Sequence, residues 1–176
     1  FMLMPFASAF SIHNLGISME QLPVLYGVTG VFSIVFGPLT GKLSDKIGKY
    51  KVFCIGSVLT MIMVVVYTNL GVTPLWQVIV LNIILFAGIL SRIISASALM
   101  TAVPEPQDRG AFMGVNSAIQ QISGGVAAAL AGLIVVQTNS GALERYDTLG
   151  YVVIFAVLVT MIMMYSIDKY VSKKEQ

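Results

Sequence analysis

The sequence predicts an all-α membrane protein, a bundle of six transmembrane helices. Three observations support this fold class. Of the 176 residues, 57% are hydrophobic and only 10% are charged, whereas about a quarter of the residues of a soluble domain are charged. The apolar residues fall into six segments that polar turns separate. Eight of the ten basic residues lie in alternate turns and in the C-terminal tail, which is the distribution expected at a cytoplasmic face.

The chain is predicted to form one domain, residues 1–176. The expected spans are residues 1–12, 22–43, 52–70, 75–103, 110–136 and 149–167. The first would cover only ~18 Å of a hydrocarbon core ~30 Å thick, so we expect a truncated helix in a chain that begins partway through it. Residues 168–176 are expected to form a charged cytoplasmic tail. An even number of spans places both termini in the cytoplasm of a multi-pass plasma membrane protein, such as one of the bacterial inner membrane.

A short basic turn joins the second and third spans. Its glycines let the chain reverse tightly, and its lysines resist crossing the bilayer. An aspartate within it can accept hydrogen bonds from a helix N-terminus or pair with a cation. The pattern is G-x-L-x-D-x-x-G followed by basic residues, and its members are Gly41, Leu43, Asp45, Lys46, Gly48, Lys49 and Lys51.

This turn resembles the signature loop of the major facilitator superfamily of transporters, which joins helices 2 and 3 and recurs between helices 8 and 9. The sequence departs from that loop at two positions. Ser44 stands where a small apolar residue is usual, and Tyr50 interrupts the basic run. The resemblance extends over the whole chain as a layout of six spans, with residues 104–110 opening the fifth.

Arg92 lies inside the fourth span, where a charge costs about 2.5–3.5 kcal/mol on insertion scales. It is either a contact for an anionic substrate or a gating ion pair, or else a structural residue that pairs with a helix end or reaches the interface. The superfamily carries an arginine here in its helix 4 or helix 10. Ser95 and Ala96 replace the Gln and Gly that usually follow it.

Amide side chains also lie within the expected spans. Asn116, Gln120 and Ser123 share one face of the fifth span by their spacing, and Asn82 lies in the fourth. Because amides need partners in hydrocarbon, these residues either line a solute path or form hydrogen bonds between helices.

Small residues recur at four-residue spacing in the second and fifth spans. Gly37 and Gly41 form one such step, and Gly124, Ala128 and Gly132 form a longer one. Such faces allow helices to pack closely in lipid. The two spans hold matching places in two groups of three, which is the arrangement of a three-plus-three inverted repeat.

Several functions are disfavoured. Every acidic residue lies outside the expected spans, and the single His13 and single Cys54 cannot form a metal site, a disulfide framework or a nucleophile–base pair. We therefore expect no enzyme activity, metal or cofactor, and the net charge of +2 gives no support to nucleic-acid binding. The fifth span has Gly124-Gly125 but no proline, so it lacks the antiporter motif of the superfamily.

The resemblance implies one six-helix half of a secondary transporter that moves a small solute by alternating access. The short tail and missing antiporter motif favour the C-terminal half, helices 7–12, whereas the well-kept signature loop favours the N-terminal half. Its partners would be the lipid bilayer, the other six-helix half and a small-molecule substrate. In this interpretation Asp45 holds a cytoplasmic gate through a helix N-terminus or through Arg92 or Arg109. The alternative is a non-transporting six-helix membrane subunit or scaffold.

Overall fold

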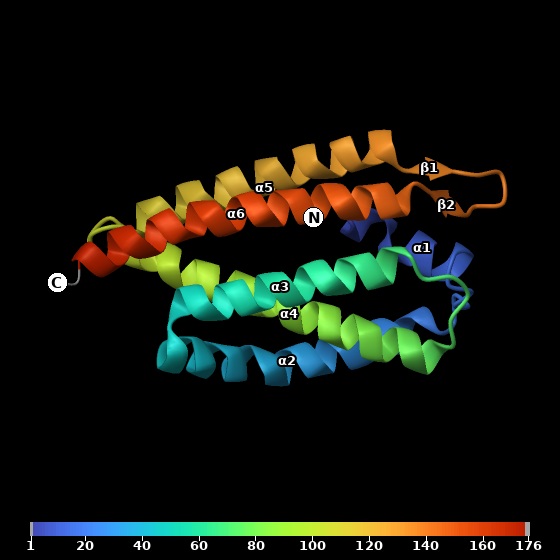
Figure 1. Ribbon diagram of the computed structural model, residues 1–176, viewed down its shortest axis with the longest axis horizontal. Helices are drawn as coiled ribbons and strands as arrows, with labels where there is room; N and C mark the ends of the chain where they lie inside the picture. Colours follow the sequence, from blue (N-terminus) through green and yellow to red (C-terminus); the bar gives the residue numbers. More distant parts are fainter. Residues whose placement is uncertain (1, 175–176) are drawn as a thin grey trace.

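The computed structural model describes residues 2–174, which are mostly helical (Figure 1). The elements in order are η1 (Met4–Phe6), α1 (Ala7–His13), α2 (Leu22–Ile47), α3 (Lys49–Thr68), α4 (Leu75–Ala102), α5 (Arg109–Ile134), β1 (Val136–Gln137), β2 (Leu143–Glu144) and α6 (Tyr146–Lys174). Within the described residues, the five helices α2 to α6 are long and apolar enough to cross a bilayer. The expected first span corresponds to η1 and α1, which have three and seven residues and do not reach spanning length.

The two ends of the bundle differ in charge (Figure 1). The α2–α3 turn, the α4–α5 connection and the end of α6 lie together at one end. We call it the basic end, because it carries Lys42, Lys46, Lys49, Lys51, Arg109, Lys169, Lys173 and Lys174. The α1–α2 and α3–α4 connections and the β1–β2 hairpin lie at the opposite end, the hairpin end. The predicted segregation of basic residues is therefore present in the fold.

The basic turn is tighter than expected. Helix α2 continues to Ile47 and α3 begins at Lys49, so Gly48 alone connects them. The φ of Gly48 is 105°, a conformation that glycine adopts at little cost. The first half of the G-x-L-x-D-x-x-G pattern is consequently the end of a helix, and the expectation of a loop there is wrong.

Two further boundaries differ from the prediction. The expected tail is helical as far as Lys174, because α6 continues through the charged residues; residues 175–176 lie outside the described part. The polar segment after α5 contains the antiparallel pair β1–β2.

The side chain of Asn14 holds this hairpin. Its amide N–H donates to the carbonyl oxygen of Leu143, and its amide oxygen accepts from the N–H of Leu143, both at 2.9 Å.

Helices α3 and α4 make the most extensive contact of the bundle. Glycines make it close: a Cβ on Gly56 would lie 2.9 Å from the carbonyl oxygen of Gly88, and a Cβ on Gly88 would lie 2.7 Å from Oγ1 of Thr60. By contrast, a Cβ on Gly41 or on Gly132 would meet nothing within 4 Å. Within the described chain, close packing is therefore made at Gly56 and Gly88, and the predicted packing faces at Gly41 and Gly132 stay open.

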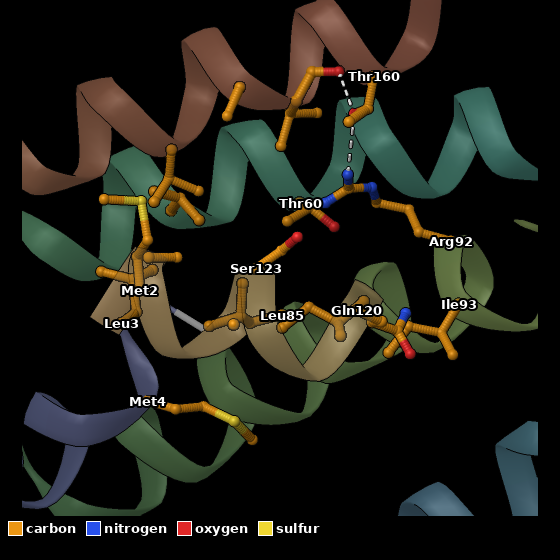
Figure 2. A pocket seen from close by; sticks show the side chains of 17 residues that line it. Met2, Leu3, Met4, Thr60, Leu85, Arg92, Ile93, Gln120, Ser123 and Thr160 are labelled. Atoms are coloured by element: carbon orange, nitrogen blue, oxygen red, sulfur yellow. Dashed lines mark hydrogen bonds between the residues drawn. The ribbon is translucent and has the colours of Figure 1, made fainter. Parts of the chain in front are cut away.

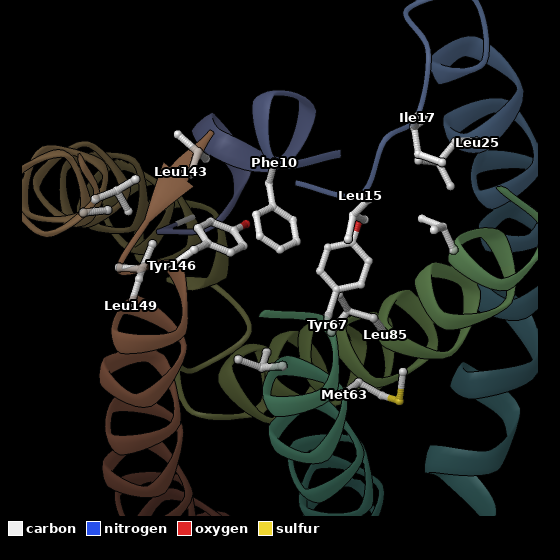
Figure 3. Close-up of a cluster of buried hydrophobic side chains, with 14 residues drawn as sticks. Phe10, Leu15, Ile17, Leu25, Met63, Tyr67, Leu85, Leu143, Tyr146 and Leu149 are labelled. Carbon is white, nitrogen blue, oxygen red and sulfur yellow. The ribbon is translucent and has the colours of Figure 1, made fainter. Parts of the chain in front are cut away.

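The largest group of buried side chains lies toward the hairpin end (Figure 3). Phe10 anchors the short α1 there, with its ring stacked 4.2 Å from that of Tyr146 and tilted 5.9 Å from that of Tyr67. Aromatic pairs in such geometries add about 0.5–1.5 kcal/mol beyond the area that they bury. This cluster fixes α1 against α3 and α6.

Candidate functional site

A cavity of about 460 Å³ lies among α3, α4, α5 and α6, with Met2, Leu3 and Met4 at one side (Figure 2). This volume is within the range of about 300–1,000 Å³ that is usual for small-molecule sites. Most of the lining side chains are apolar. The polar ones are Thr60, Arg92, Gln120, Ser123 and Thr160. Among the described residues that line this cavity, Arg92 is the only charged one.

The side chain of Arg92 reaches from α4 to α6 (Figure 2). Its Nη2 donates to Oγ1 of Thr160 at 3.3 Å, and its Cζ lies 5.6 Å from the centre of the Phe53 ring. Within residues 2–174, the buried Nε has no hydrogen-bond partner and the guanidinium forms no ion pair. Arg92 is about 5 Å from the midpoint of α4, so the charge is held deep inside the spanning part of the bundle.

The four residues predicted to line a solute path do not all meet. Arg92 and Gln120 line the same cavity. Asn116 lies one turn from Gln120 toward the basic end of α5, half-buried and outside the lining. Asn82 is 4% exposed and donates to Oγ1 of Thr29 at 3.0 Å, so it forms the hydrogen bond between helices that was one of its two predicted roles.

Sequence reasoning missed Thr160, the partner of Arg92. Its hydroxyl donates to the carbonyl oxygen of Val157 at 2.8 Å, which leaves the oxygen free to accept from Arg92. A signal was present, because Thr160 is the one polar residue in the run from Val152 to Met164. Hydropathy alone does not reveal it, since a self-satisfied threonine is common in apolar helices.

A second cavity, of about 330 Å³, lies at the basic end. Its lining residues are Ser44, Asp45, Gly48, Lys49, Leu99, Asp168, Val171 and Ser172. No side chain caps the first residue of α3, and within residues 2–174 Asp45 forms no ion pair with Arg92 or Arg109. The signature pattern therefore contributes two charged side chains, those of Asp45 and Lys49, to the cavity between α2, α3, α4 and α6.

The ion pair formed at the basic end joins other residues. Nζ of Lys174 lies 2.8 Å from a carboxylate oxygen of Glu105 and donates to the carbonyl oxygen of Val103 at 3.2 Å. The hydrogen bond and the charge of Lys174 hold the pKa of Glu105 below its usual value. The contact ties the end of α6 to the α4–α5 connection, although both groups remain in water and the pair adds little stability.

Two of the four positions at which the sequence departs from the superfamily patterns, Ser44 and Ser95, contact each other. Ser95 donates to the hydroxyl oxygen of Ser44 at 3.3 Å, and both side chains are buried. Ser95 follows Arg92 by one helical turn, and Ser44 precedes Asp45. This hydrogen bond therefore joins the end of α2 to the segment of α4 that presents Arg92 to the larger cavity.

Long apolar helices around a mostly apolar cavity with a few converging polar groups are the features of an integral membrane protein that binds a small solute. Comparison with protein families matches residues 1–176 to the Major Facilitator Superfamily. The chain belongs to this superfamily, and it is accordingly a multi-pass membrane protein of the transporter type. Comparisons with curated proteins and with solved structures find no match.

Proposed function

We propose that the chain is one six-helix half of a secondary transporter, which moves a small solute by alternating access to the cavity among α3, α4, α5 and α6. The single observation that carries this proposal is the placement of Arg92. It lies near the middle of a spanning helix, it lines a cavity of ligand size, and no residue of the described chain neutralises it. Intramembrane charges of this kind mark solute or ion pathways.

The exposed side of α5 supports a second half. Gln120 and Ser123 line the cavity and, with Ser117 and Gln121, remain exposed in the isolated chain. Such groups are costly in hydrocarbon, so this side must face water or another helix. In the most apolar stretch of α2 and in that of α5, only 11% of the residues are buried, against 50% in α3. The second and fifth helices are thus the least buried of the five long helices, which is compatible with the proposed three-plus-three repeat.

The basic end would face the cytoplasm by the distribution of its lysines. In this proposal Asp45, with the other signature residues and Arg109, forms the cytoplasmic gate around the smaller cavity. The Ser44–Ser95 hydrogen bond, 3.3 Å long, gives a contiguous route from that gate to α4. Movement of the end of α2 would then shift Arg92, which is how a gate could be coupled to solute binding.

A scaffold subunit explains these features less well. It would need apolar helices and close glycine contacts, which the chain has, but not a charged residue in a cavity or polar residues on the open side of α5. Replacing Arg92 by an apolar residue should improve the stability of a scaffold. The same change should abolish solute binding in a transporter.

Labelling of a single cysteine tests alternating access. In the complete protein with Cys54→Ser, a Gln120→Cys side chain should react with a membrane-impermeant maleimide added from either side. Asp45→Ala should shift that reactivity toward the cytoplasmic side, because it weakens the outward-open state. Ile122→Cys is the matched control, since Ile122 is 69% exposed on α5 but outside the cavity. Reactivity of position 120 from one side only, whatever the gate variant, would contradict the proposal.

A further inference from the structure

We infer that the solute of the α3–α6 cavity is an amphipathic monoanion, with a carboxylate on Arg92 and an apolar body along the aliphatic walls. This inference rests on the proposed function and names its substrate class. It comes from three observations: the unbalanced charge of Arg92, the composition of the cavity wall, and the separation of polar from apolar lining along the cavity.

The charge of Arg92 is stabilised only weakly by the described chain. A guanidinium has five N–H donors, yet the structure gives this one a single hydrogen bond, to Thr160 at 3.3 Å. The ring of Phe53 offers a cation–π contact at 5.6 Å, which leaves the positive charge intact. An isolated charge in a low-dielectric site is costly. An anion that enters the cavity removes this cost, so the site selects a negatively charged group.

The remaining wall selects the rest of the ligand. Aliphatic side chains from three helices form most of it, among them Val64, Leu85, Ile89, Val153 and Val157. Figure 2 shows Arg92 and Thr160 toward one end of the cavity and Met2 and Leu3 toward the other. A ligand that fills this space therefore needs a charged head and an apolar tail.

Other substrate classes fit less well. A sugar needs many hydrogen-bond partners, whereas the polar side chains among the described lining residues are those of Thr60, Arg92, Gln120, Ser123 and Thr160. An amino acid or a cation needs a carboxylate for its positive group, and no acidic residue lies among the described lining residues. A phosphate monoester carries about −1.5 to −2 charges at neutral pH and a dicarboxylate carries two, which a single arginine does not neutralise.

The test compares carboxylates with amides of the same skeleton. The probes are the ω-phenylalkanoates from phenylacetate to 6-phenylhexanoate, each with its primary amide, titrated into the complete protein in nanodiscs. At least one carboxylate should bind about tenfold to a hundredfold more tightly than its amide, which is the effect of a hydrogen bond to a charged group. That advantage should disappear in Arg92→Gln. It should persist in Arg145→Gln, which removes the same charge at an exposed position of the hairpin end.

The inference is wrong if no carboxylate binds more tightly than its amide, or if the advantage survives in Arg92→Gln. Should Arg92→Gln fail to fold, protection of Gln120→Cys gives the answer in the otherwise unchanged cavity: the preferred carboxylate must slow maleimide labelling more than its amide does, and equal rates overturn the inference. Labelling from both sides with no carboxylate preference would reject the substrate class but keep the transporter. Carboxylate binding with one-sided labelling would reject transport but keep the site.

Discussion

The contact between Gly56 of α3 and Gly88 of α4 predicts a large effect of a single methyl group. In Gly56→Ala the new Cβ would lie 2.6 Å from Cβ of Ser91, 2.9 Å from the carbonyl oxygen of Gly88 and 3.2 Å from the backbone nitrogen of Arg92. Carbon atoms in contact normally lie about 3.5–4.0 Å apart. Because two of these neighbours are backbone atoms, no side-chain rotation relieves the clash, and the helices must separate locally by about 1 Å.

Overpacking of a well-packed contact costs about 1–3 kcal/mol. We expect Gly56→Ala to lie in the upper half of that range, because all three close neighbours are backbone or Cβ atoms that cannot rotate away. The free energy of unfolding should therefore fall by about 2–3 kcal/mol. The backbone of Arg92 moves with α4, so affinity for the preferred carboxylate probe should also fall.

Unfolding of the complete protein in detergent, followed by circular dichroism, measures the effect. The matched control is Gly30→Ala in α2, where a Cβ would meet nothing within 4 Å. That change should be neutral or stabilising by up to about 1 kcal/mol, because alanine is the better helix former. If Gly56→Ala is no more destabilising than Gly30→Ala, the α3–α4 packing described above is wrong.

Three further changes have definite expected outcomes. Asn82→Leu should lower the free energy of unfolding by about 0.6–1.7 kcal/mol, and a double-mutant cycle with Thr29→Val should return the same coupling energy; a coupling of zero would refute the bond. Asn14→Ala should speed amide hydrogen exchange in β1 and β2, measured by mass spectrometry, because it removes both 2.9 Å bonds to that hairpin; unchanged exchange would refute this. Lys174→Met should raise the pKa of Glu105 toward its ordinary value in an NMR titration; an unmoved pKa would exclude the ion pair.

The pH dependence of that ion pair has a definite sign. The pKa of Glu105 is lowered in the folded protein, so its contribution to stability is present above the ordinary carboxyl pKa. It is lost as the pH falls through the lowered pKa. Because Glu105 is solvent-exposed, the contribution is small, and release of the end of α6 is a better readout than global unfolding.

The positions of the spanning helices could be predicted because the hydropathy of a segment indicates whether it favours lipid or water. It does not measure where a helix ends. The charged residues after Ile167 and those before Gly48 continue helices α6 and α2, so both boundaries were placed too early. Spacing of small residues likewise predicts a face that can pack closely, but the partner helix decides which face does, and here it is that of Gly56 and Gly88.

The candidate site was predictable in part for a similar reason. Arg92 and Gln120 stand out because ionised and amide groups are rare in apolar spans, and both line the cavity. Asn82 stands out equally, but its amide donates a hydrogen bond to Thr29. Only the packing of α4 on α2 reveals this partner. Thr160 was missed because a single threonine in an apolar helix does not indicate a site. Its role follows only from the hydrogen bond that it accepts from Arg92.

The central claim is that this chain forms half of a transporter, and that the solute enters the cavity among α3, α4, α5 and α6 beside a second half. A cryo-electron microscopy structure of the complete protein in nanodiscs, with the preferred carboxylate probe bound, tests it most directly. We predict a second six-helix unit against the open surfaces of α2 and α5, with the probe beside Arg92 near the bilayer midplane. Lipid covering Gln120 on α5, with no second unit facing the cavity, would contradict the claim.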